Sequence, residues 1–87
     1  MQFKTLPFVE TSSNGTITST WSVQPTGDHV RDRAKGRQYY AQLVTAIIED
    51  GNTLHLSLVI EGQVRAGKWS GIETGFHAAL AELVEWI

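Results

Sequence analysis

Residues 28–49 constrain this chain more than any other stretch, because they form its one plausible long helix. Pro25, Thr26 and Gly27 precede the stretch, and Gly51 and Asn52 follow it. A side-chain oxygen at the start can cap free N–H groups, and glycine at the end can take the left-handed turn that closes a helix. These start and stop signals stand in the right order, so we predict a helix over residues 28–49.

One apolar stripe of this helix is expected to face the core. At about 100° per residue, the stripe contains Val30, Ala34, Ala41, Val44 and Ile48. Arg37 lies in the middle of the same stripe and interrupts it. The pattern predicts a core-facing side that is not uniformly apolar.

A second apolar flank makes the helix unusually wide on its apolar side. Tyr39, Leu43 and Ile47 recur every four residues outside the first stripe. A helix with so wide an apolar arc either lies between two layers or exposes apolar surface to a partner. On the second interpretation the flank is a candidate apolar interface, and we expect a homodimer with Leu43 near its twofold axis.

The N-terminal turns of the same helix are strongly basic. Its basic side chains form pairs four residues apart, and like charges at this spacing repel each other. These side chains also lie at the positive end of the helix dipole, where acids are preferred. They form either a solvated face or a contact surface for an anion, a nucleic acid or an acidic partner. The net charge of the chain is −2, which argues against bulk attraction to nucleic acid or membranes. The candidate contact residues are Arg31, Arg33, Lys35 and Arg37.

The N-terminal residues favour a β-hairpin. Residues 2–10 favour a strand, but Pro7 restricts them to an edge position. Asn14 and Gly15 form a strong turn signal. Residues 16–23 then alternate, with Ile17, Trp21 and Val23 on one side.

Two further segments complete the predicted elements. In residues 53–66 the apolar residues alternate as in a strand, whereas Asn52 and Gly67 can cap and end a helix. Ser70 and Glu73 form a capping box for a helix over residues 71–86. Its apolar stripe consists of Ile72, Phe76, Ala79, Leu80, Leu83, Val84 and Ile87.

From Trp21 onward the chain resembles a family of short uncharacterised proteins of proteobacteria and their prophages. The resemblance rests on residues 21–28 (WSVQPTGD), on Gly36 with Tyr40 and Ala41, and on residues 67–77 (GKWSGIETGFH). It implies that residues 52–66 are helical and implies no enzymatic activity. Together with the small acidic format, it suggests a phage-borne inhibitor of a host complex.

No residue pattern in the sequence predicts catalysis or a cofactor. Residues 62–69 match the first seven positions of a phosphate-binding P-loop, but Trp69 replaces the serine or threonine that holds magnesium. The histidines are scattered and cysteine is absent, so no metal-site spacing exists. Glu73 and His77 share a helix face, and Ser70 is assigned to the cap. We therefore predict a non-enzyme without cofactor or metal.

The sequence predicts one small α+β domain over residues 1–87. It consists of an N-terminal β-hairpin followed by three helices, 28–49, 53–66 and 71–86; the alternative is a ββαβα two-layer sandwich with residues 53–60 as a third strand. The opening residues lack the pattern of a signal peptide, and no apolar run approaches the ~20 residues of a membrane span, so we expect a cytoplasmic protein. The expected function is binding of another protein, and nucleic-acid binding through the basic turns, with Tyr39 or Tyr40 stacking on bases, is the alternative.

Overall fold

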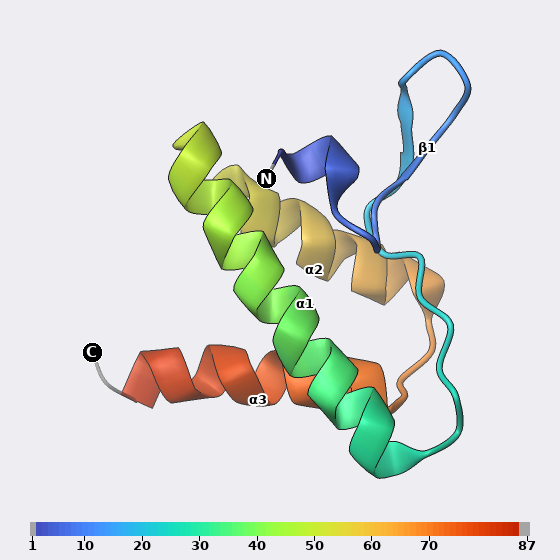
Figure 1. Ribbon diagram of the computed structural model, residues 1–87, viewed down its shortest axis with the longest axis vertical. Helices are drawn as coiled ribbons and strands as arrows, with labels where there is room; N and C mark the ends of the chain where they lie inside the picture. Colours follow the sequence, from blue (N-terminus) through green and yellow to red (C-terminus); the bar gives the residue numbers. More distant parts are fainter. Residues whose placement is uncertain (1, 86–87) are drawn as a thin grey trace. The chain divides into compact units, whose positions relative to one another are not determined.

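The chain forms a short N-terminal hairpin followed by three helices (Figure 1). This computed structural model describes the backbone of residues 2–85 and the side chains of residues 2–82. The α+β class predicted from the sequence is confirmed. The elements are the 3₁₀ turn η1 (Phe3–Thr5), strands β1 (Glu10–Thr11) and β2 (Ile17–Ser19), and helices α1 (His29–Asp50), α2 (Leu54–Ala66) and α3 (Gly71–Glu85).

Helix α2 settles the segment that the sequence left open. The Asn52 side chain accepts a hydrogen bond from the Leu54 amide at 3.0 Å, and Gly67 ends the helix with a left-handed φ of 67°. The helical prediction is therefore confirmed, and the ββαβα alternative is wrong. Gly62 lies inside this helix and Gly67 caps it, so the partial P-loop match belongs to a helix and its end.

The chain divides into two compact units, and α1 contributes residues to both. The first unit comprises residues 2–23 and 42–68. Its core contains Phe8 and Trp21, whose ring centroids are 5.2 Å apart. The Thr20 hydroxyl donates to the Leu58 carbonyl oxygen at 2.6 Å, and a Cβ on Gly62 would lie 3.1 Å from the Trp21 amide nitrogen. Glycine in α2 thus allows the segment after β2 to approach the helix closely.

The hairpin is shorter than the sequence predicts. Residues 3–5 form the turn η1 instead of a strand, and β1 and β2 pair antiparallel over two and three residues. Pro7 has no N–H for a ladder, and Phe3, Leu6, Phe8 and Val9 are all buried without alternation. The turn itself is as predicted: the Asn14 side chain accepts from the Thr16 amide at 3.1 Å, and Gly15 has a φ of 84°.

The second unit comprises residues 24–41 and 69–85, and within it α1 and α3 touch backbone to backbone. A Cβ on Gly36 would lie 1.9 Å from the Ile72 carbonyl oxygen, and a Cβ on Gly75 would lie 1.9 Å from the Arg33 carbonyl oxygen. Only glycine permits so close a crossing at these two positions. Phe76 is fully buried, and the Tyr40 ring packs edge-on against it with centroids 5.4 Å apart.

Helix α3 begins as predicted. The Ser70 hydroxyl accepts from the Ile72 amide at 3.2 Å, and the Glu73 carboxylate accepts from the Ser70 amide, which confirms the capping box. The Glu73 side chain is buried. The predicted helix end at Trp86, the side chains of Leu83 and Val84, and Ile87 lie outside the described residues.

The predicted orientation of α1 is wrong. Val30 and Ile48 are 78% and 74% exposed, and Ala34 and Ala41 are also exposed. The buried face instead runs through Asp32, Gly36, Leu43 and Ala46. Gly36 is buried because it allows close contact with another helix, and Asp32 is buried because its carboxylate receives hydrogen bonds. Hydrophobicity alone predicts burial of Val30 and Ala34 instead.

Candidate functional site

The structure separates the four basic residues that the sequence grouped together. Arg31 and Lys35 line one pocket on α1, and Arg33 is exposed without lining it. Arg37 donates to the Glu82 carboxylate at 2.8 Å, and this hydrogen bond raises the pKa of Arg37 and lowers the pKa of Glu82. Two of the four predicted contact residues therefore belong to one concave site.

This pocket, named the α1 pocket, has a volume of about 410 Å³. Its wall is one flank of α1, and its rim includes the loop before that helix. The lining also includes Ile72 of α3, whose side chain is almost fully buried. The volume lies within the roughly 300–1,000 Å³ typical of ligand pockets. The lining residues are Gln24, Thr26, Arg31, Asp32, Ala34, Lys35, Gln38, Tyr39 and Ile72.

Asp32 fixes the loop that forms the rim. Its carboxylate accepts from the Thr26 amide at 3.0 Å, from the Thr26 hydroxyl at 2.8 Å and from the Gly27 amide at 3.2 Å. The hydrogen bond from the Thr26 amide is the main reason that the pKa of Asp32 is lowered. Asp28 caps the helix beside it by accepting from the Val30 and Arg31 amides. The Asp32 carboxylate thus holds the loop before α1, and Asp28 caps the helix at the Arg31 amide.

The cations of the pocket have no such partner. Among the side chains of residues 2–82, neither Arg31 nor Lys35 forms an ion pair, and Gln24 and Gln38 form no hydrogen bond. The Lys35 ammonium lies 5.8 Å from the centroid of the Tyr39 ring. Burial raises the pKa of Tyr39. The pocket therefore combines two unpaired positive charges and two unused amides with apolar surface.

The candidate apolar interface does not form an exposed patch. Leu43 has no exposed surface, while Tyr39 and Ile47 are half-buried. The prediction that Leu43 stands at the centre of a dimer surface is wrong, because its side chain is part of the core. Tyr39 belongs to the α1 pocket instead.

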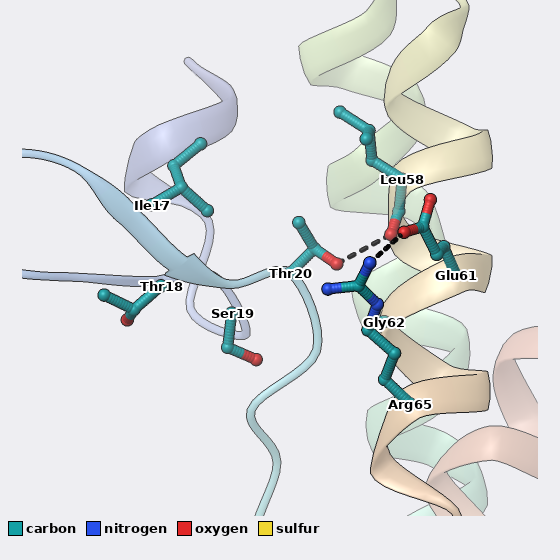
Figure 2. A pocket seen from close by; sticks show the side chains of 8 residues that line it. All are labelled: Ile17, Thr18, Ser19, Thr20, Leu58, Glu61, Gly62 and Arg65. Atoms are coloured by element: carbon teal, nitrogen blue, oxygen red, sulfur yellow. Dashed lines mark hydrogen bonds and ion pairs between the residues drawn. The ribbon is translucent and has the colours of Figure 1, made fainter.

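A second pocket, of about 220 Å³, lies between the hairpin and α2 in the first unit (Figure 2). Its polar side chains are already engaged within the protein. The Thr18 hydroxyl donates to the Glu10 carbonyl oxygen, Ser19 accepts from the Trp21 amide, and Arg65 pairs with Glu61 at 2.7 Å. The Thr20 hydroxyl is bonded to the Leu58 carbonyl oxygen, as Figure 2 also shows. This pocket therefore has fewer polar side chains without a hydrogen-bond or ion-pair partner than the α1 pocket.

The residues weighed for catalysis serve the start of α3. The Ser70 hydroxyl donates to the Glu73 carboxylate at 2.6 Å while it caps the Ile72 amide. The His77 ring lies 5.0 Å from the Trp69 ring, and burial lowers its pKa against a smaller opposing effect of Glu73. Within the described part of the chain, no group of three or more histidine or acidic side chains is placed to hold a metal ion.

The sequence pattern identified Arg31 and Lys35 but missed the rest of the pocket. Gln24, Gln38 and Ile72 lie on three different segments, and no spacing rule joins them. The one available signal was the Thr26-Gly27-Asp28 turn before the helix, which positions the rim.

Comparison of the chain with protein-family models, with curated proteins and with solved structures gives no match. Across residues 2–85, no helix has both the length and the apolar character needed to cross a bilayer.

Proposed function

We propose that this chain is a non-enzymatic protein-binding module, and that its α1 pocket receives an acidic segment of a partner protein. The observation that carries the proposal is the pair of unpaired cations, Arg31 and Lys35, at one pocket with apolar surface. Their mutual repulsion and the positive end of the helix dipole both favour an anion at this position. A carboxylate held between them would relieve both effects.

Two observations favour a protein over a nucleic acid. The Lys35 ammonium lies over the Tyr39 ring and the Tyr40 ring packs edge-on against Phe76, so both rings already make a contact within the protein that would compete with base stacking. The net charge of −2 also opposes the long-range attraction that dominates binding to phosphate backbones. Ala34 and the half-buried Tyr39 ring line the pocket and suit an apolar side chain of the partner segment.

Fluorescence anisotropy with a labelled library of short acidic peptides tests this proposal. The wild type should bind members that carry an apolar side chain, and versions with amides in place of the acids should not bind. The double variant Arg31→Glu, Lys35→Glu should lose about tenfold or more in affinity, equal to about 1.4 kcal/mol.

Arg33→Glu is the control for one such charge reversal, since it replaces a single cation by an acid on the same helix outside the pocket, half the charge change of the double variant. It should leave the affinity for the peptides nearly unchanged. A loss of binding free energy in Arg33→Glu that is half the loss in the double variant would show that only net charge matters. Tighter binding of a labelled single-stranded oligonucleotide, with an affinity that falls steeply as salt rises, would replace the proposal by nucleic-acid binding.

A further inference from the structure

We infer that the α1 pocket recognises an extended acidic segment whose two carboxylates are separated by one residue, an acid-x-acid pattern. This inference rests on the proposed function and specifies its ligand. It follows from the spacing of the two cations and from the unused amides beside them.

The spacing of the cations comes from the helix. Arg31 and Lys35 are four residues apart on one face of α1, which places their Cβ atoms roughly 5–6 Å apart. In an extended chain, side chains two residues apart lie on the same side, about 6.4–6.8 Å apart. Adjacent acids point to opposite sides of such a chain, so only one could reach the pocket. An acid-x-acid pattern therefore matches the two cations with one carboxylate each.

A helical ligand with acids four residues apart would show a similar spacing, but the amides argue against it. Gln24 and Gln38 both line the pocket, and neither side chain has a hydrogen-bond partner among the described residues. A glutamine amide offers donors and an acceptor, which are the groups that a peptide N–H and C=O require. The backbone of a helix uses these groups internally, whereas an extended backbone leaves them free.

The positions of the lining residues also indicate how the bound segment is aligned with α1. Arg31, Lys35 and Gln38 follow one another along the same flank of α1 at intervals of four and three residues. The ligand backbone would therefore run along the helix, with its acids over the first two turns and an amide contact at Gln38. Asp32 stays ionised in the pocket wall, and amide hydrogen bonds from Thr26 and Gly27 balance part of its charge, so Arg31 and Lys35 still leave the pocket with a net positive charge.

A panel of peptides with identical composition and net charge tests the inference. The two acids are adjacent, separated by one residue, or four residues apart with three residues between them, and the affinity of each peptide is measured by anisotropy. The acid-x-acid peptide should bind about tenfold more tightly than the other two. Lys35→Gln should abolish this preference, whereas Arg33→Gln should retain it. Gln38→Met, which keeps the side-chain length without the amide, should weaken the acid-x-acid peptide while the order of the peptides stays the same.

Three outcomes would overturn the inference in different ways. Equal affinity for all three peptides would refute the spacing and leave the proposed function standing. Preference for the peptide with acids four residues apart, with helical circular dichroism of the bound peptide, would show that the ligand is a helix. Absence of binding by every acidic peptide would refute the proposed function itself.

Discussion

Substitution of Gly36 by alanine tests the packing of the unit that carries the α1 pocket. In an exposed helix this change is stabilising by about 0.8–1.0 kcal/mol, because alanine has the higher helix propensity. At Gly36 the new Cβ would lie 1.9 Å from the Ile72 carbonyl oxygen and 2.7 Å from the Phe76 amide nitrogen. Both neighbours are backbone atoms of α3, so no side-chain rotation can relieve the overlap.

The expected cost follows from this geometry. An ordinary Cβ contact begins near 3.4 Å, so α1 and α3 would have to separate by about 1.5 Å. Overpacking of this kind costs about 1–3 kcal/mol or more and outweighs the gain in propensity. For a chain of this size, a net loss of about 2 kcal/mol lowers the melting temperature by roughly 8–16 °C.

Thermal unfolding followed by circular dichroism measures the effect. Ser57→Ala, at an exposed position of α2, is the control: it gains helix propensity without a clash and should raise stability by roughly half a kcal/mol. The double variant Gly36→Ala, Gly75→Ala should lose less than the two single losses combined, because one separation of the helices relieves both overlaps. A rise in melting temperature for Gly36→Ala, like that of the control, would refute the close crossing.

Three further predictions follow from buried side chains. Phe76→Ala should destabilise the protein by about 3–5 kcal/mol in urea unfolding, since the ring is fully buried, and an unchanged midpoint would contradict that burial. Leu43→Glu should unfold the chain, since it places an unpaired charge in the core. A folded variant would show that Leu43 is exposed and would restore the dimer surface as a hypothesis. The hydrogen bonds from Thr26 and Gly27 depress the pKa of Asp32 in the folded state, so its stabilising effect is full above the ordinary value of 3.8 and is lost as pH falls through the lowered pKa. The stability difference between wild type and Asp32→Asn should therefore shrink below about pH 4, and a difference that grows on acidification would contradict this sign.

The helices could be predicted because their ends carry local signals. Asn52 and Gly67 cap and close α2, and the Ser70–Glu73 capping box starts α3. These signals depend only on neighbours in the sequence. For α2 the alternation of apolar residues indicated a strand against these signals, so the residues alone left that segment open.

The faces of α1 could not be predicted because its packing depends on other segments. Gly36 is buried where α3 approaches within backbone contact, and Asp32 is buried where Thr26 and Gly27 donate to it. Hydrophobicity scales rank both residues as poor core residues, so the pattern selected Val30 and Ala34. Because the orientation of α1 was predicted wrongly, Leu43 was placed on an exposed apolar flank, whereas its side chain is buried. The predicted homodimer was based on that flank and therefore has no exposed surface at Leu43.

The sequence identified the basic residues of the candidate site but could not tell which of them lie at the pocket. Arg31, Arg33, Lys35 and Arg37 look equivalent in the sequence, and the structure distinguishes them through their partners. Glu82 lies 45 residues from Arg37 and neutralises it, while Arg31 and Lys35 meet Gln24 and Ile72 at the pocket. Such distinctions arise from tertiary contacts between distant segments.

The central claim is that an acidic segment binds in the α1 pocket, and chemical-shift mapping by heteronuclear NMR tests it most directly. An acid-x-acid peptide is titrated into the isotope-labelled protein. We expect the largest amide shifts at Thr26, Arg31, Lys35, Gln38 and Tyr39, whereas residues 17–20 and 61–65 at the second pocket should stay nearly unchanged. Shifts concentrated at the second pocket, or spread evenly over exposed cations including Arg33, would contradict it.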